Sequence, residues 1–525
     1  MGLEVYRVIG GEADRLGVEA YAVGGVVRDY FLGRACTDID IVCIGHEEGG
    51  ERRVESGERR VVRGTPPSIG IELARAVAGV LGGSRVSVFK GFGTASFRYG
   101  DVELEFVGAR KESYSRESRK PVVENGTLEE DLRRRDFTVN ALAVCLNGDR
   151  YGELVDVFGG IGDLNLGVLR TPLDPDVTFS DDPLRMMRAV RFASQLGFRI
   201  ADDTLEAMGR NAGRMKIVSA ERVTTELNKI MMSRRPSVGL KLMQRCGLME
   251  VVLPEVSALG GVETVEGRGH KDIFFHTMQV VDNVVESGEW RVESGEWRVG
   301  SGERRVESGE WRAESGERRV ESKKALWLRW AALLHDVGKP GVKRYDERQG
   351  WTFHGHEARG ARMVKRIFQR LRLPLGEEMR YVEKLVMLHM RPIILAEEEV
   401  TDSAVRRLLF EAGDDIEDLM VLCSADITTR NEEKQRRHRR NFELVKRKLV
   451  ELEERDRIRN FQPPVSGEDI MEVFGIGPCR EIGVIKEAIK EAILEGEIAN
   501  EREAAWRMML GVGAELGLRE VKSEK

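Results

Sequence analysis

The stretch GGVVRDYFLGRACTDID, residues 24–40, decides how the N-terminal part of this chain folds. It begins with the glycine pair Gly24–Gly25, which lets backbone N–H groups approach a polyphosphate closely. The pair stands at the expected start of a helix, whose dipole favours anions at that end. Arg28 follows within one helical turn. This half of the stretch therefore predicts a site for a phosphate chain.

The other half of the stretch carries two acids separated by one apolar residue. On a β-strand, Asp38 and Asp40 point to the same face, while Ile39 enters the core. Two parallel carboxylates repel each other unless a cation lies between them, and hard oxygen ligands suit Mg²⁺. Together the two halves predict a nucleoside triphosphate held on metal ions, ready for phosphoryl or nucleotidyl transfer.

Taken separately, a glycine pair is typical of turns, and an Asp-x-Asp pair is typical of solvated loops and strand ends. Their ordered combination within 17 residues resembles the active-site signature of the DNA polymerase beta nucleotidyltransferase superfamily. More narrowly, it is similar to the branch that contains CCA-adding tRNA nucleotidyltransferases and bacterial poly(A) polymerases. The resemblance implies that Asp38 and Asp40 are catalytic metal ligands, and that Gly24, Gly25 and Arg28 bind the nucleotide.

The whole chain has the composition of a soluble protein with several domains. At 525 residues it is too long for one core, so three or four domains are expected. No apolar run reaches the roughly 18–20 residues of a membrane helix, and the N-terminus lacks the pattern of a signal peptide. The six cysteines form no C-x-x-C pair and are interpreted as reduced thiols of a cytoplasmic protein.

The overall charge does not indicate a nucleic-acid partner, because the formal net charge is −6. Basic residues are concentrated locally in the segment Arg430–Lys448. A solvated helix face and a contact with RNA phosphates are both compatible with this segment.

Near-identical heptads of the type ESGEWRV run from Glu286 to Val320, and a related fragment occupies Glu51–Val61. A coiled coil is excluded, because each heptad carries a glycine that costs about 1 kcal/mol in a helix, and because Trp and Val lie two residues apart. The repeats predict a poor, exposed hairpin array or a disordered segment. We interpret them as functionally inert insertions into surface loops, at about 46–68 and 286–322.

Strands and helices are expected to alternate in the N-terminal third of the chain. From about residue 175 onward the pattern is almost entirely helical. The strand at 103–107 is expected to end the catalytic sheet, and its Glu105 is a candidate third metal-binding carboxylate; a solvent-facing strand acid is the alternative. The expected strands are 22–23, 38–43, 84–89, 94–98, 103–107 and 141–145, and the expected helices lie near 9–17, 25–32, 71–81 and 129–134.

A basic motif, LRRRDFTVNA, follows at residues 132–141. Arginines can bind triphosphate oxygens through two parallel N–H groups, and Asn140 can bond a ribose hydroxyl or a phosphate. A basic run by itself is typical of a solvated face. In this order it resembles the family motif R-R-D-F-x-x-N-A, which implies nucleotide binding by Arg134, Arg135, Asp136 and Asn140.

A third motif, DDPLRMMRAVRFA, spans residues 181–193. Asp182 and Arg185 are three residues apart and share one helix face, so an acceptor and a donor fork could recognise the edge of a nucleobase. The alternative is an ordinary cap with an exposed salt bridge. The motif resembles the family's E-D-x-x-R element, which selects CTP and ATP, although Asp181 replaces its glutamate. Arg188 is included in the predicted nucleotide site.

The segment Ser219–Leu227 resembles the next helical motif of the family, which is expected to support the nucleotide-selecting helix.

A possible second metal centre begins with the His335-Asp336 pair inside an apolar segment. Buried polar groups need partners, and one metal ion would satisfy both side chains. Together with His276 and Asp426 the pair resembles the HD phosphohydrolase domain, and a second metal at this centre would add His356 and His389. A purely structural, helix-rich spacer is the alternative.

The resemblance as a whole implies an α+β chain. It predicts a polymerase-beta-like head with a mixed sheet, followed by an all-α neck, an HD domain and a tail. The predicted boundaries are 1–165 for the catalytic head, 166–258 for the nucleotide-selecting and RNA-binding neck, 259–455 for the HD domain and 456–525 for the tRNA-binding tail.

The expected activity is template-independent addition of C, C and A to the 3′ end of tRNA from CTP and ATP, with Mg²⁺ as cofactor and pyrophosphate as product. A poly(A) polymerase or an enzyme adding only CC or only A is the alternative within this class. A metal-dependent HD phosphohydrolase acting on cyclic nucleotides or phosphate esters and a noncatalytic tRNA-binding scaffold are the alternatives from other classes. A membrane partner is not expected.

Overall fold

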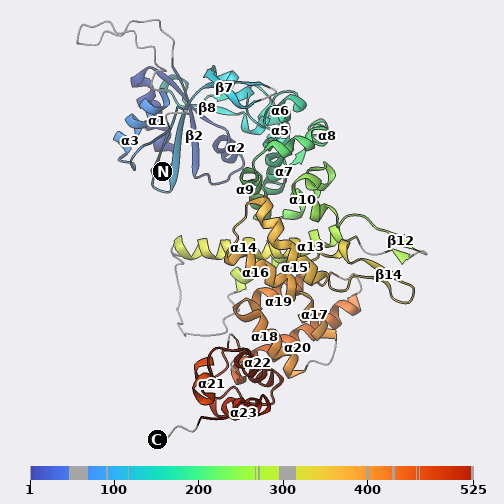
Figure 1. Ribbon diagram of the computed structural model, residues 1–525. Coiled ribbons are helices and arrows are strands. Elements are labelled where there is room, and N and C mark those ends of the chain that lie inside the picture. Colours follow the sequence, from blue (N-terminus) through green and yellow to red (C-terminus); the bar gives the residue numbers. More distant parts are fainter. Residues whose placement is uncertain are drawn as a thin grey trace. The chain divides into compact units, whose positions relative to one another are not determined.

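The computed structural model describes residues 2–45, 69–89, 93–115, 118–265, 268–269, 272–294, 315–397, 401–428, 432–456, 458–459 and 461–521. The predicted insertion at 46–68 and the central part of the second one, 295–314, lie outside these residues. The chain forms two compact units, drawn in Figure 1. The first comprises Met1–Glu226 with Leu242–Val251, and the second comprises Leu227–Lys241 with Val252–Lys525.

The first unit is built on a mixed seven-stranded sheet with the strand order β3-β4-β5-β2-β1-β8-β9. Strand β2 pairs antiparallel with β1 and parallel with β5, so it lies in the interior of the sheet. The strands are β1 (Val18–Val23), β2 (Asp38–Gly45), β3 (Ser87–Phe89), β4 (Thr94–Tyr99), β5 (Val102–Gly108), β8 (Ala143–Cys145) and β9 (Leu154–Val155).

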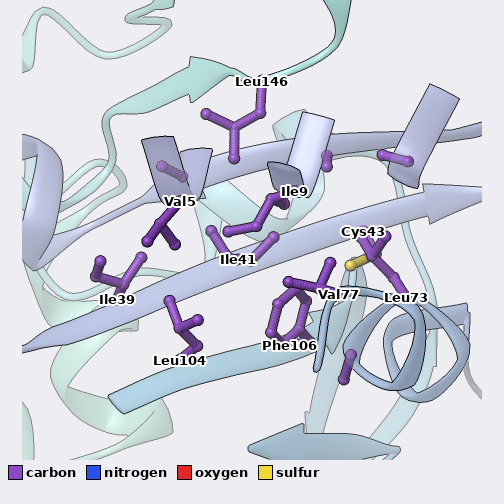
Figure 2. Packing of buried hydrophobic residues seen from close by; sticks show 14 of the residues in the cluster. Val5, Ile9, Ile39, Ile41, Cys43, Leu73, Val77, Leu104, Phe106 and Leu146 are labelled. Atoms are coloured by element: carbon purple, nitrogen blue, oxygen red, sulfur yellow. The ribbon is translucent and has the colours of Figure 1, made fainter. Parts of the chain in front are cut away.

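Two helices, α1 (Gly2–Leu16) and α3 (Ile69–Leu81), pack on one face of this sheet. Figure 2 shows that Ile39 and Ile41 of β2 point into this core with Leu104 and Phe106 of β5. Since side chains alternate along a strand, the residues between them face the other side of the sheet. The hydrophobic period of two thus fixes which face of β2 carries its acids.

Several element boundaries differ from those expected from the sequence. Helix α1 begins at Gly2 instead of near residue 9, since Val5, Ile9 and Ala13 form a continuous buried stripe. Strand β3 is shorter than expected, and a hairpin of β6 (Arg110–Ser115) and β7 (Ser118–Asn125) was not predicted.

Strand β5 does not end the sheet but lies between β4 and β2. Strand order depends on long-range pairing, which local patterns do not encode.

The neck within the first unit is helical, as expected. Its helix α6 starts at Pro175 behind the cap residue Asp174, and α7 follows after Pro183. A short parallel pair of strands, β10 (Val168–Leu169) and β11 (Arg199–Ile200), flanks these two helices in the sequence. The helices of this unit are α4 (Leu128–Arg133), α5 (Gly160–Leu166), α6 (Pro175–Asp181), α7 (Leu184–Leu196) and α8 (Asp202–Asn211). Helices α9 (Ala220–Met231), α10 (Pro236–Arg245) and α11 (Leu248–Val252) each include residues of both units.

The second unit is built mainly of helices. Those that bear on its candidate centre are α13 (Ile273–Ser294), α14 (Ser315–Leu334), α15 (His356–Leu371), α16 (Glu377–Leu388), α17 (Met390–Glu397) and α19 (Ile416–Asp426). The others include α12 (Pro254–Ser257), α18 (Asp402–Ala412), α20 (Glu432–Asp456), α21 (Gly467–Phe474), α22 (Arg480–Glu495) and α23 (Arg502–Glu515).

The prediction of a hairpin array or disorder for the heptad repeats is wrong where the structure describes them. Helix α13 continues through the first repeat to Ser294, and α14 already begins at Ser315. Extending an existing helix avoids the cost of nucleation, and this outweighs about 1 kcal/mol for each glycine.

Among the described residues, no helix is long and apolar enough to cross a membrane.

Candidate active site and metal centre

Asp38 and Asp40 lie on the face of β2 opposite the core, because Ile39 and Ile41 are buried beneath the sheet. Strand pairing places Asp40 opposite Glu105 of β5 and Val23 of β1. Glu105 is exposed and is therefore on the same sheet face as the two aspartates. Its role as a third metal ligand stays a prediction.

The electrostatics around Asp40 favour a cation. Burial raises the pKa of Asp40, Arg135 lowers it, and the carboxylates of Asp38 and Asp131 raise it further, with a net upward shift. The ionised form is thus disfavoured by lost water and by like charges, and a bound cation would offset both effects. The carboxylate oxygens fit Mg²⁺, which prefers hard oxygen ligands.

The glycine pair lies at the start of α2 (Gly25–Phe31). Gly24 has a positive φ of 77°, which favours glycine. A Cβ atom at Gly24 would lie 2.6 Å from Nη1 of Arg135, so a side chain here would displace the arginine. Arg135 therefore lies directly over the glycine loop, where a phosphate chain was predicted.

Both arginines of the basic motif are held by Asp131, a residue of α4 that the sequence analysis did not select. Arg134 donates from Nε (3.0 Å) and Nη2 (2.5 Å) to Oδ1 of Asp131. Arg135 donates from Nε (3.3 Å) and Nη2 (3.0 Å) to Oδ2. The available signal was the spacing, since Asp131 precedes the arginines by three and four residues.

A buried hydrogen-bond network connects Arg28 to Arg188. Nη1 of Arg28 donates to Oδ1 of Asn140 over 2.7 Å, and Nδ2 of Asn140 donates to Oδ1 of Asp136 over 2.9 Å. Nε of Arg188 donates to Oδ2 of Asp136 over 2.7 Å. Asn140 thus has protein partners at both ends of its amide, and Arg28 binds Asp29 as well. These residues form the floor of the site.

Arg185 lies in the first turn of α7, but Asp182 precedes this helix with an extended backbone (φ −133°, ψ 97°), so the predicted shared helix face is wrong. The two side chains bind different partners. Nη2 of Arg185 donates to the backbone carbonyl of Arg134 over 2.5 Å. Asp182 accepts the Leu184 amide at 3.2 Å and Nη2 of Arg222 at 3.2 Å. Arg222 belongs to α9, within the motif expected to support this helix. The pair predicted to select the base is thus held by contacts from two sides.

The histidine centre of the second unit is assembled from helices far apart in the sequence. Its members come from α13, the end of α14, the start of α15, the α16–α17 junction and the end of α19. Two groups of three have donor atoms within 4.8 Å of one another: His276, His335 and Asp426 form one, and Asp336, His356 and His389 form the other.

Each of these imidazoles is oriented through Nδ1. His335, His356 and His389 bond the carbonyl oxygens of Ala332, Phe353 and Val386, all three residues upstream, at 2.7–2.8 Å. His276 Nδ1 lies 2.9 Å from Thr428 Oγ1. A ring whose Nδ1 carries the proton presents a lone pair on Nε2, as a metal ligand does.

The inward-facing atoms fit a cation. Nε2 of His356 and Nε2 of His389 are 3.2 Å apart, and with both Nδ1 atoms donating, two lone pairs face each other. Within the part of the chain that the structure describes, Nε2 of His335 and Oδ1 of Asp336 are buried without a hydrogen-bond partner. Since buried polar atoms need partners, a divalent cation would satisfy this donor set.

The neighbouring charges at this centre shift the pKa values of two histidines in opposite directions. Burial lowers the pKa of His335, but Asp336 and Asp426 raise it overall to about 10. Burial and the neighbouring His335 lower the pKa of His389 to about 4. Without a cation, positive charge on His335 thus offsets the carboxylates of Asp336 and Asp426.

Family models match three parts of the chain. The poly A polymerase head domain matches residues 20–170, and the probable RNA and SrmB-binding site of polymerase A matches residues 197–259. The HD domain matches residues 309–431.

Curated relatives match nearly the whole chain. The A-adding tRNA nucleotidyltransferase of Deinococcus radiodurans is 30% identical over 92% of this chain and 94% of the relative. The CC-adding tRNA nucleotidyltransferase of Thermus thermophilus is 30% identical over 93% of this chain and 92% of the relative.

Solved structures show the same fold. An apo form of a CCA-adding enzyme has a TM-score of 0.59 at 21% identity, covering 97% of this chain and 94% of that one. The expected α+β fold, with a mixed-sheet head followed by helical regions, is confirmed. The chain is a nucleotidyltransferase and belongs to the tRNA nucleotidyltransferase family with a poly(A) polymerase-type head and an HD domain.

Proposed function

We propose that this protein adds C, C and A to the 3′ end of tRNA, using CTP and ATP and no nucleic-acid template. One observation carries the proposal: the side chain of Arg134 is held with Arg135 by Asp131, and its backbone carbonyl holds Arg185. The arginines that we propose bind the triphosphate are thus connected to the helix that we propose selects the base, beside the aspartate pair of β2.

The triphosphate lies, in this proposal, between the glycine loop and the arginines. Arg135 faces Gly24, and Arg28 uses three of its five N–H groups within the protein, which leaves two for phosphate oxygens. Asp38 and Asp40 would hold Mg²⁺, which supplies activation of the tRNA 3′-hydroxyl and charge neutralisation at the phosphates.

The base is selected by Asp182 and Arg185. Cytosine and adenine both present an amino donor next to a ring-nitrogen acceptor, which suits a carboxylate beside an arginine. Uracil and guanine present a carbonyl acceptor and an N–H donor there instead, so each would face the wrong partner. This pattern favours CTP and ATP together.

The decisive experiment supplies tRNA lacking its 3′ end with CTP alone, ATP alone, or both. We expect two additions with CTP alone and three with both. The curated relatives described above are A-adding and CC-adding enzymes, so addition of only CC, or of only A to a tRNA ending in CC, would assign a partial activity. A long A tract would indicate a poly(A) polymerase. Binding without incorporation would indicate a scaffold.

The histidine centre supports a second function, metal-dependent phosphohydrolysis. The opposed lone pairs of His356 and His389 and the unpartnered Oδ1 of Asp336 favour one or two divalent cations. A cation there would supply an activated water and polarise a phosphate ester. Hydrolysis of a 2′,3′-cyclic nucleotide should vanish in His335→Ala and survive in Asp40→Ala. Equal activity in His335→Ala and the wild type would contradict this function.

The proposed location is the cytoplasm. All six cysteines are free, which is consistent with a reducing compartment.

A further inference from the structure

The carboxylate of Asp131 is unusual for an acid next to a basic run, because none of its surface is exposed. Each carboxylate oxygen serves one arginine, and each arginine uses the same two atoms, Nε and Nη2. Although burial raises its pKa, Arg135 and Arg134 lower it overall. The carboxylate of Asp131 is therefore ionised and buried, and it holds Arg134 and Arg135 in place. It differs in this from an acid in an ion pair on the solvated surface.

The arginine that Asp131 holds is aimed at the nucleotide site. With Nε and Nη2 of Arg135 directed to Asp131, Nη1 faces Gly24, 2.6 Å from the position of an added Cβ. The same guanidinium interacts with the carboxyl of Asp40. A planar guanidinium fixed along one edge can present its other edge in one orientation only.

Arg134 connects Asp131 to Arg185, the arginine that we propose selects the base. Arg134 is held by Asp131 through its side chain, and its carbonyl accepts Nη2 of Arg185. A change in the position of Arg134 would thus move the acceptor that orients Arg185.

We propose that Asp131 is a positioning residue for nucleotide binding: it fixes Arg135 over the glycine loop and Arg134 beside Arg185. This inference rests on the proposed function, since it assigns Arg135 to the triphosphate. Asp131 itself does not touch the nucleotide. Without its charge the two arginines repel each other and lose their common orientation.

The test compares Asp131→Asn with the matched control Asp176→Asn. Asp176 also accepts two N–H groups from one arginine, Arg210, and one from Asn211, but it is partly exposed on α6, outside the nucleotide site. In Asp131→Asn we expect the Kd of a non-hydrolysable CTP analogue, measured without tRNA, and the KM for CTP and ATP to rise about tenfold or more. The Kd for tRNA should not change, and Asp176→Asn should match the wild type. Unchanged nucleotide affinity in a folded Asp131→Asn protein would overturn the proposal.

A double-mutant cycle with Arg135→Gln separates positioning from a merely structural role. If Asp131 acts through Arg135, the effects on nucleotide Kd are not additive: Asp131→Asn has a smaller effect once Arg135 is absent, and the remaining effect comes from Arg134. Full additivity would overturn the proposal.

Should Asp131→Asn fail to fold, Arg135→Lys gives the same information, because lysine keeps the charge but cannot bridge Asp131 and Gly24 with a rigid fork. An unchanged KM in Arg135→Lys would count against the proposal. A wild-type protein that binds the analogue but adds no nucleotide to tRNA would contradict the proposed function alone.

Discussion

The aspartate pair of the first unit and the histidine centre of the second are both candidate metal sites, but they are built differently. Asp38 is exposed and Asp40 is half-buried, on one strand, and arginines and glycines surround them. At the histidine centre five of the six side chains are buried and come from several helices, with every imidazole oriented by a hydrogen bond.

This difference indicates when each site is completed. The open site leaves ligand positions for a triphosphate and an RNA end, so substrate binding completes it. The histidine centre is assembled by the fold before any substrate arrives, and two of its buried atoms have no hydrogen-bond partner. We therefore expect a cation there to stabilise the fold. In our proposal, the site on β2 needs metal for chemistry alone, and the histidine centre needs it for stability as well.

The largest effect is expected on nucleotide incorporation, when the aspartate pair of β2 is changed. Asp40→Ala should reduce incorporation of labelled CMP into tRNA at least about 1,000-fold, because it removes a carboxylate that we propose holds the catalytic cation. Asp101→Ala, in the exposed turn between β4 and β5, is the control and should retain activity. If Asp40→Ala also removed the metal bound at the histidine centre, the two sites would not be independent, which would contradict the difference drawn between them.

The second-largest effect is expected on the metal content and the Tm, when the histidine centre is changed. His335→Ala, or treatment with a chelator, should remove the bound metal measured by elemental analysis and lower the Tm by about 5–15 °C. His354→Ala serves as the control, since His354 is exposed two residues from His356. Identical metal content and Tm in His335→Ala and wild type would show that the centre is only a packed polar cluster.

A smaller effect is expected for Arg185→Ala, which should spare metal binding but relax nucleotide selection. We expect the preference for CTP and ATP over UTP and GTP to fall about tenfold to a hundredfold in kcat/KM. Arg210→Ala, an exposed arginine paired with Asp176, is the control. Unchanged preference in Arg185→Ala would remove this residue from base selection.

The smallest effect is a pH dependence of stability at the floor of the open site. Burial raises the pKa of Asp136, but Arg188 and Asn140 lower it overall below its ordinary value. The unfolded state therefore binds a proton near pH 4 that the folded state does not, and stability is lost as the pH falls from about 4 toward the folded pKa. The decrease in Tm between pH 5 and pH 3.5 should be smaller in Asp136→Asn than in wild type. An equal decrease would show that Asp136 does not contribute.

Much of the site around Asp38 and Asp40 could be predicted, because it depends on spacings between residues that are close together in the sequence. The period of two along β2 determines that Asp38 and Asp40 share a face. The spacing of three wrongly predicts a shared helix face for Asp182 and Arg185, because α7 begins only after Pro183 and Asp182 has an extended backbone. Asp131 also lies within one helical turn of its arginines, but nothing local shows that it is buried. The predicted role of Asn140 as a nucleotide ligand has no such support, because the fold supplies partners for both ends of its amide.

The sequence by itself determined the chemical content of this protein: which carboxylates, arginines and histidines it carries, and which of them share a strand or helix face. Only the tertiary structure decided which distant groups meet. Arg28 and Asn140 are 112 residues apart, and His276 and Thr428 are 152 residues apart. The physical reason is that such pairings follow from the packing of whole sheets and helices, which local periodicity does not specify.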